Sequence, residues 1–174
     1  MIADHDVRFT SNSGWRRLAD FSLPSEPGND RRAMELVGHI VQPLELSPAR
    51  TERLRTAVAE AALNAIEHGN GYRRELPVRI SVWACDTALV VTITDEGASD
   101  ARLVTPEPNL EAKLSGSQSP RGWGLFLIRN MADAVILHDD RGQHTIELMF
   151  FLSDSSDSSD GDNRSGEEAE INGS

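Results

Sequence analysis

Apolar and polar residues along the first half of the chain follow a pattern that predicts one strand and two helices. Residues 18–23 form a short, largely apolar run that ends at a proline and a turn-forming sequence, as a strand would. Residues 30–41 place their apolar side chains three or four positions apart, which is the spacing of one helical face. Residues 48–68 repeat that spacing over a longer stretch. A Ser-Pro pair before this stretch and Gly69-Asn70-Gly71 after it are typical of a helix start and a helix end.

The middle of the chain carries the pattern of a hairpin followed by a long loop. In residues 78–82 and 89–93 apolar and polar side chains alternate, and residues 84–87 between them predict the hairpin turn. Residues 98–120 contain three prolines and little apolar pattern, which predicts a long loop inside the domain. Loops of this length are usually functional lids or disordered segments.

The last part of the pattern predicts a helix over residues 123–132 and then two strands, over residues 134–138 and 145–152. A turn over residues 139–142 joins these strands. The expected order is strand, helix, helix, strand, strand, loop, helix, strand, strand. Because the strands come in hairpins, we expect an α+β fold of two layers, with a mixed, mostly antiparallel sheet covered on one face by helices.

The length of 174 residues suits one domain with a sizeable core. We expect that domain over residues 15–152, after a polar and poorly patterned segment over residues 1–14. Residues 153–174 are rich in serine, aspartate, glutamate and glycine. They hold too few apolar side chains to offset the entropy of ordering the chain. We therefore expect them to form a disordered acidic tail.

Charge and composition exclude several classes of function. The net charge is −11, and the seven acids and one arginine of the tail account for −6 of it. An acidic chain argues against nucleic acid as the main partner. The longest apolar runs are far shorter than a membrane span, and the N-terminus has no apolar signal segment. The single cysteine, Cys85, cannot form an internal disulfide and suits a reducing compartment. We therefore expect a cytoplasmic protein that binds neither nucleic acid nor membrane directly.

Glu60 and Asn64 lie four residues apart in the longer predicted helix, roughly 40° apart on one face. A carboxamide oxygen suits Mg²⁺, which commonly bridges to nucleotide phosphates. A carboxylate one turn away can accept a proton from an attacking hydroxyl or water. Taken alone, an acid and an amide at this spacing are more often ordinary polar residues on a solvent-facing helix.

Two further segments combine glycines with polar residues. Asp95 and Gly97 follow a predicted strand, where a carboxylate can point into a cleft and accept a hydrogen bond from an exocyclic amine such as that of adenine. Arg121, Gly122 and Gly124 precede an apolar helix, where backbone N–H groups and an arginine can meet phosphate oxygens. Each segment alone also fits a strand-ending turn or a simple helix entry. The glycines match neither a P-loop nor a dinucleotide-binding βαβ unit.

In this order the three segments resemble the GHKL ATPase/kinase superfamily. Residues 60–69, 95–97 and 121–125 are similar to its asparagine box and its two glycine boxes. The sequences Glu-Ala-Ala-Leu-Asn-Ala-Ile-Glu-His-Gly-Asn and Gly-Trp-Gly-Leu-Phe-Leu-Ile-Arg-Asn-Met-Ala-Asp are especially similar to the anti-sigma-factor serine/threonine kinases, the RsbW-like branch. The resemblance covers residues 15–152 and implies the Bergerat-type two-layer fold.

The resemblance also implies a role for each motif residue. Glu60 would be the general base, and Asn64 would bind Mg²⁺ and, through it, the nucleotide. Asp95 would accept a hydrogen bond from the adenine amino group. The other positions implied to surround ATP are Gly97 beside the base, Thr145 on the adenine side through a water, and Arg121, Gly122 and Gly124 at the phosphates. Residues 98–120 would be the ATP lid, and His68 matches a histidine of this branch without an assigned role.

The function implied by the resemblance is that of an ATP- and Mg²⁺-dependent serine/threonine protein kinase that acts as an anti-sigma factor by partner switching. Such a protein would hold a sigma factor or phosphorylate a small anti-anti-sigma antagonist, and it would be a homodimer. The chain departs from the family pattern where Gly97 is followed by Ala98 and Ser99 rather than a second glycine, and in its long, proline-bearing lid. These departures leave open a nucleotide-dependent module that sequesters a partner without significant phosphotransfer. The catalytic half of a histidine kinase is a third alternative, although the chain shows no helical hairpin with a phosphoacceptor histidine.

Overall fold

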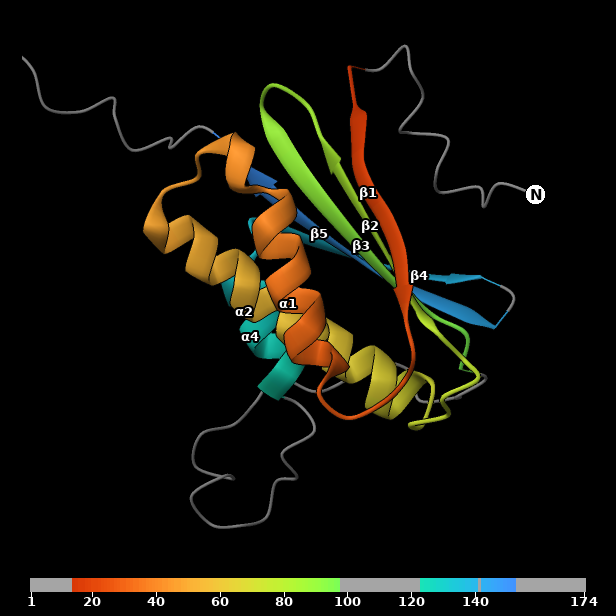
Figure 1. Cartoon of the computed structure of the whole chain (residues 1–174). Helices are drawn as coiled ribbons and strands as arrows, with labels where there is room; N and C mark the ends of the chain where they lie inside the picture. The colour runs from red at the N-terminus through yellow and green to blue at the C-terminus, as the bar shows by residue number, and fades with distance from the viewer. Residues whose placement is uncertain (1–13, 98–122, 141, 153–174) are drawn as a thin grey trace, which may run out of the picture.

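The computed structural model describes residues 14–97, 123–140 and 142–152. Within these ranges the chain forms a five-stranded sheet with helices on one face (Figure 1). The strands are β1 (Arg16–Leu23), β2 (Val78–Ala84), β3 (Ala88–Asp95), β4 (Ala134–Asp140) and β5 (Gln143–Phe151). The helices are α1 (Asn29–Ile40), α2 (Pro48–Asn64) and α4 (Trp123–Met131), with a 3₁₀ turn η2 (Gln42–Leu44) and a π-helical turn η3 (Ala65–Gly69). The predicted α+β fold of two layers is confirmed.

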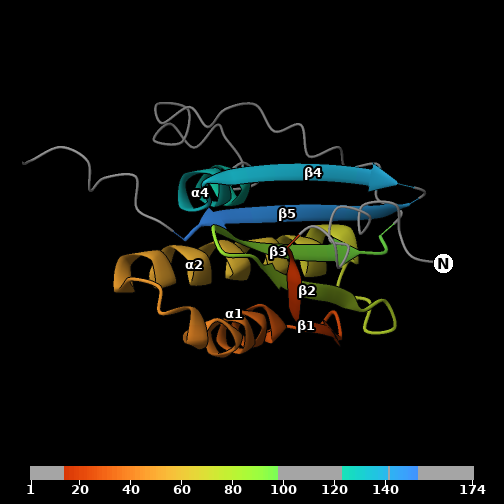
Figure 2. The ribbon, with the colours of Figure 1, turned by 90° about the horizontal axis from the view of Figure 1, so that it is seen from above.

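The strand order is β1-β2-β3-β5-β4, so β5 lies between β3 and β4 (Figure 2). We expected a mixed sheet, but all four pairings between the described strands are antiparallel. The strands β3 and β4, which are joined through α4, do run in the same direction. They are not neighbours, however, because β5 inserts between them and pairs antiparallel with both. The hairpin therefore removes the parallel pair that a helical crossover would otherwise make.

The core lies between the inner face of the sheet and the helices. Alternation along β5 directs Ile146, Leu148 and Phe150 toward the helices, since successive side chains point to opposite faces of a sheet. The apolar face of α2 and η3 packs in the middle of this core and contributes Leu54, Val58, Ala61, Ala62 and Ile66. The apolar face of the long predicted helix therefore packs against the sheet, and its polar face is available to the site described below.

The last two strands are longer than the apolar pattern predicts. β4 continues through Asp139 and Asp140 of the predicted turn, and β5 starts at Gln143, two residues before the predicted start, so that Asp140 pairs with Gln143. The ladder continues because its hydrogen bonds join backbone groups and do not depend on apolar side chains. This extension places His144 opposite Asp95 on β3 and opposite Asp139 on β4.

The predicted helix over residues 48–68 is α-helical only as far as Asn64. It starts as expected, because the Ser47 hydroxyl accepts a hydrogen bond from the backbone N–H of Arg50 at 3.3 Å and a proline follows at the first position. At the other end it widens into η3, where the N–H of Asn70 donates to the carbonyl of Ala65 at 2.8 Å. Single π turns of this kind occur frequently at functional sites.

Several predictions concern segments outside the described residues. They are the N-terminal segment up to residue 13, the ATP lid over residues 98–120, and the acidic tail over residues 153–174. Among the helices that are described, none is both long and apolar enough to cross a membrane. Cys85 lies in the β2–β3 turn, where its Sγ is 3.6 Å from the Thr87 hydroxyl.

Candidate functional site

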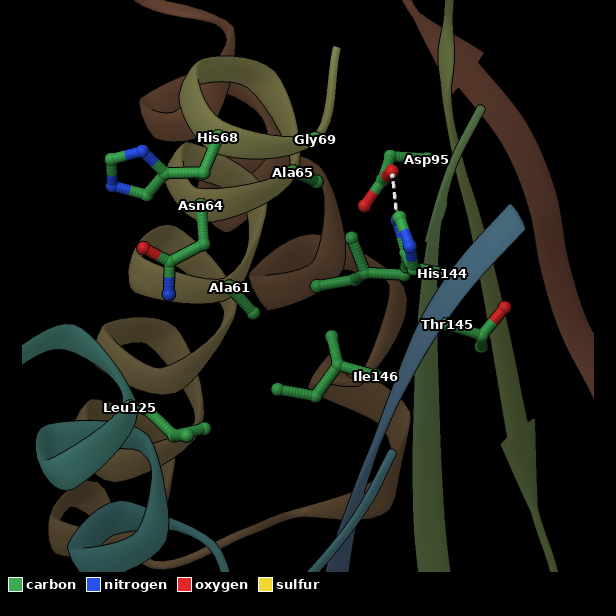
Figure 3. Close-up of a pocket in the computed structure, with 11 residues that line it drawn as sticks. Ala61, Asn64, Ala65, His68, Gly69, Asp95, Leu125, His144, Thr145 and Ile146 are labelled. Carbon is green, nitrogen blue, oxygen red and sulfur yellow. Dashed lines mark hydrogen bonds and ion pairs between the residues drawn. The ribbon is translucent and has the colours of Figure 1, made fainter. Parts of the chain in front are cut away.

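A pocket opens between α2 and η3 on one side and the ends of β3 and β5 on the other (Figure 3). Its walls are mostly apolar, and polar side chains lie at its rim and its far end. The lining residues are Ala61, Asn64, Ala65, His68, Gly69, Ile93, Asp95, Leu125, His144, Thr145 and Ile146. An apolar slot with a few convergent polar groups is the usual form of a small-molecule site.

Glu60, Asn64 and Gly124 come together where α4 packs against α2. A Cβ atom at position 124 would lie 3.2 Å from both terminal atoms of the Asn64 carboxamide and 3.3 Å from Oε2 of Glu60. A side chain at 124 would therefore crowd both polar groups, whereas glycine leaves the start of α4 open beside them. The first and third motifs of the sequence are thus neighbours, although about 60 residues separate them in the chain.

Gly69, Asp95 and Gly97 come together at the opposite end of the pocket. A Cβ atom at Gly69 would overlap the Asp95 carboxylate, and a Cβ atom at Gly97 would overlap the carbonyl oxygen of Gly69. Glycine is therefore required at both positions by close backbone approach. The sequence identified Gly69 as a helix stop and as the end of the segment that resembles the asparagine box, and the structure adds that it packs directly against the proposed base-recognition acid.

Asn70 fixes this close approach and was not predicted as a site residue. It is completely buried. Its amide nitrogen donates to the Ser25 hydroxyl at 2.9 Å and to the carbonyl of Leu76 at 3.0 Å. Its amide oxygen accepts from the N–H of Glu96 at 3.0 Å. Asn70 thereby ties the end of η3 to the end of β3, and its position within Gly69-Asn70-Gly71 was the available signal.

Asp95 is the polar group at the far end of the pocket and is only 7% exposed. Its Oδ1 accepts hydrogen bonds from the N–H of Gly97 and from Nδ1 of His144, each at 3.1 Å. Burial raises the pKa of the Asp95 carboxyl above its ordinary value, and the bonds from His144 and Gly97 offset only part of that rise. Asp95 is therefore a desolvated acceptor whose ionisation depends on its two donors.

The resemblance placed Thr145 on the adenine side through a water and gave His144 no role, but it is His144 that contacts Asp95. The Thr145 hydroxyl lies 2.8 Å from the Thr94 hydroxyl, and Figure 3 shows its side chain turned away from Asp95. His144, one residue earlier, points to Asp95 instead. The signal for His144 was the alternation of the strand, because residue 144 shares the core-facing side of Ile146.

A charged cluster joins α2 to the segment between α4 and β4. Asp133 accepts from Arg50 at 3.3 Å and Arg53 at 3.2 Å, and also from the N–H of Phe151 at 2.7 Å. Burial alone would raise the pKa of Asp133, but the Phe151 hydrogen bond and the two arginines outweigh it and lower the pKa. This cluster holds α4, and with it Gly124, against α2.

The remaining predicted site residues are not all placed. His68 lines the pocket rim but is exposed, and its ring points away from Asp95 (Figure 3). Arg121 and Gly122 lie outside the described residues. Within the described part of the chain, no group of three histidine, cysteine or acidic residues could hold a metal ion.

Comparison with known proteins finds relatives that are named as anti-sigma factors. The chain is 31% identical to the Anti-sigma F factor of Bacillus cytotoxicus over 135 residues, which is 73% of this chain and 87% of that protein. It is 30% identical to the Anti-sigma F factor of Bacillus thuringiensis over the same length and coverage.

Among solved structures, the fold is similar to the RsbU and RsbW domains of a Mycobacterium tuberculosis protein. The TM-score is 0.53 at 13% sequence identity, and the match covers 76% of this chain but only 32% of that longer one. This likeness concerns the fold alone. Residues 23–150, which include every element from the end of β1 to most of β5, match the family described as "Histidine kinase-like ATPase domain". The chain belongs to the family of histidine kinase-like ATPase domains.

Proposed function

We propose that this chain is an ATP-dependent serine/threonine protein kinase that acts as an anti-sigma factor by partner switching. The observation that carries the proposal is the convergence of Glu60 and Gly124 on Asn64, which lines one end of a pocket whose other end holds Asp95. The relatives named as anti-sigma F factors support the regulatory part of the proposal. In this reading the partners are a sigma factor and a small anti-anti-sigma protein.

The residues present suit a magnesium nucleotide. Mg²⁺ needs only one or two protein oxygens besides phosphate oxygens and waters, so the Asn64 carboxamide can serve as its protein ligand. The ion, when bound, neutralises charge on the phosphates. The apolar walls Ala61, Ala65 and Ile93 suit a flat base, and Asp95 suits its amino group. Backbone N–H groups near Gly124, at the start of α4, would meet the phosphates, and the open space that glycine leaves beside Asn64 supports this role.

Glu60 is the proposed general base. Its carboxylate lies beside Asn64 near the start of α4, where an incoming hydroxyl would meet the terminal phosphate. Glu60 would take the proton of a serine or threonine hydroxyl as the oxygen bonds to phosphorus and ADP leaves. The phosphorylated antagonist gains nearly two negative charges, which would release it from an acidic partner by repulsion.

The test is a phosphotransfer assay on the small proteins that co-purify from the native cell, with Mg²⁺-ATP. Labelling on serine or threonine is expected, and Asn64→Ala should abolish it. Glu60→Gln should still bind ATP but transfer phosphate at least about a hundredfold more slowly. Glu52→Gln is the matched control, because Glu52 is an exposed acid on the same helix, about two turns away.

The same variants separate this proposal from the sequestering module. If no co-purified protein is labelled while ATP binds, and Glu60→Gln still regulates the partner, nucleotide-dependent binding is the function and phosphotransfer is not. We also propose, from the resemblance, that the protein is a cytoplasmic homodimer. Sedimentation equilibrium at micromolar concentration tests the dimer.

A further inference from the structure

We propose that His144 is a positioning residue for base recognition: it holds Asp95 through Oδ1 so that Oδ2 stays available to an amino group of the bound base. This inference rests on the proposed function, since it concerns the same nucleotide pocket. It assigns to His144 a task that the sequence motifs do not give to any residue. The expected ligand preference is an amino-substituted purine over an oxo-substituted one.

The first step is the uneven use of the two carboxylate oxygens. Two donors, the N–H of Gly97 and Nδ1 of His144, both reach Oδ1 at 3.1 Å. Among the described residues none donates to Oδ2. The carboxylate cannot swing toward η3, because Gly69 packs directly against it. Asp95 is therefore oriented from two sides, and its second oxygen is left for a ligand.

The second step is the placement of the imidazole across three strands. His144 on β5 is paired in register with Asp95 on β3 and with Asp139 on β4. Its Nδ1 meets the buried Asp95, and its Nε2 lies 4.0 Å from Oδ1 of Asp139, whose side chain is 78% exposed. The inner acid thus orients the ring by a short hydrogen bond, while the outer acid adds a weak, screened attraction.

The third step is the chemical consequence of a donor at this position. An ionised carboxylate only accepts hydrogen bonds, so it matches the amino group of adenine and repels the carbonyl oxygen of guanine. A protonated carboxyl can donate, and it would tolerate that carbonyl. By stabilising the ionised form of a buried acid, His144 preserves the discrimination. Loss of the His144 side chain should weaken ATP binding and reduce the preference for ATP over GTP. It should also cause ATP affinity to decline at a higher pH as the solution is acidified.

Other titratable groups near the site do not substitute for His144. From β4 the facing group is Asp139, which is an acid and cannot donate when ionised. From η3 it is His68, which is exposed and whose ring points away from Asp95 (Figure 3). Protonation of the triphosphate itself also changes with pH, but it affects all variants equally.

The experiment is calorimetric titration of Mg²⁺-ATP and Mg²⁺-GTP into the wild-type chain, His144→Leu and His144→Asn, between about pH 5 and pH 8. Asparagine can keep a donor near the position of Nδ1, whereas leucine cannot. At neutral pH we expect His144→Leu to bind ATP roughly tenfold more weakly, with a smaller ATP-to-GTP ratio, and His144→Asn to stay within about threefold of wild type. Gln143→Leu, at an exposed neighbouring position of β5, is the control and should match wild type.

The pH profile distinguishes positioning from general damage. As pH is lowered, ATP affinity should decline first in His144→Leu, next in His144→Asn, and last in wild type. If the leucine variant does not fold, the difference between asparagine and wild type still carries the test. If wild type and His144→Leu have the same ratio of ATP affinity to GTP affinity and the same pH profile, the inference about His144 is overturned while the proposed function stands. A wild-type chain that binds neither nucleotide would overturn the proposed function as well.

Discussion

The ionised Asp95 carboxylate lowers the stability of the fold but is proposed to strengthen the binding of the base. Burial raises the pKa of its carboxyl in the folded state above that in the unfolded chain. The unfolded state therefore releases this proton at a lower pH, and the folded state loses stability as pH rises through the raised pKa. Above this raised pKa the ionised side chain destabilises the fold, and the ligand that it is proposed to bind would explain why a carboxylate occupies this position.

Asp95→Asn should therefore separate stability from binding. The amide oxygen can still accept from Gly97 and His144, so we expect a higher midpoint of thermal unfolding at neutral pH. This gain should vanish below about pH 4, where the wild-type carboxyl is protonated in both states. ATP affinity should fall at least about tenfold. With the amide oxygen bonded to Gly97 and His144, the other position holds an NH₂ group, which cannot accept a hydrogen bond from the amino group of the base. Calorimetry and titration over pH test both parts, and a variant that is less stable at neutral pH would contradict the first.

At the scale of residues, the sequence predicted which motifs come together better than it predicted where the side chains point. Glu60, Asn64 and Asp95 were recognisable because each belongs to a motif with its own spacing. His144 was missed, because the resemblance drew attention to Thr145 and because the apolar pattern placed the strand start one residue after it. Asn70 was missed because glycines on both sides made the segment look like a simple stop.

Among the elements, η3 is where sequence reasoning was least complete. The apolar spacing supports helix to residue 68, but spacing alone cannot distinguish an α turn from a π turn. The π turn depends on contacts with β3 and the Ser25 loop, which are distant in sequence. Asn70 provides those contacts, so the shape of the pocket depends on a buried amide that is not among its lining residues.

Asn70→Ala should cost roughly 2–3 kcal/mol of unfolding free energy, because it removes the acceptor of the Glu96 N–H and the amide donor to the Ser25 hydroxyl and the Leu76 carbonyl. Ser25→Ala should cost about 1 kcal/mol, since the amide still reaches the carbonyl of Leu76. Urea unfolding curves at constant slope measure both. Equal costs for the two variants would mean that Asn70 is not the central member of this network.

For the whole molecule, hairpins and helices were sufficient to predict two layers, since the inner face of each strand follows from its alternation. The prediction was a mixed sheet, whereas every pairing between the described strands is antiparallel. The sequence does not show that β5 inserts between β3 and β4. The lid, Arg121, Gly122 and the acidic tail remain predictions. Their function depends on residues beyond the described ranges.

Binding of Mg²⁺-ATP should stabilise the whole chain by mass action. At a hundredfold excess over the dissociation constant, about 2.7 kcal/mol is expected, or roughly 5 to 10 °C in the unfolding midpoint. Gly124→Ala should lose most of this shift, because its Cβ would press on Asn64 and Glu60. Gly38→Ala should keep the shift and raise the basal midpoint, since its nearest neighbour atoms, in Arg55, are 3.8 Å away and helix α1 favours alanine. Equal shifts in both variants would count against phosphates at the start of α4.

The insertion of β5 between β3 and β4 also orders the events of synthesis. While the ribosome is still making residues 143–151, β3 has an unpaired edge that is open to other chains. The partner of Asp95 is also still missing, because His144 comes with that last strand. A nascent chain therefore cannot complete its nucleotide pocket early, and any premature stop within β5 would yield a product that is both inactive and prone to aggregate.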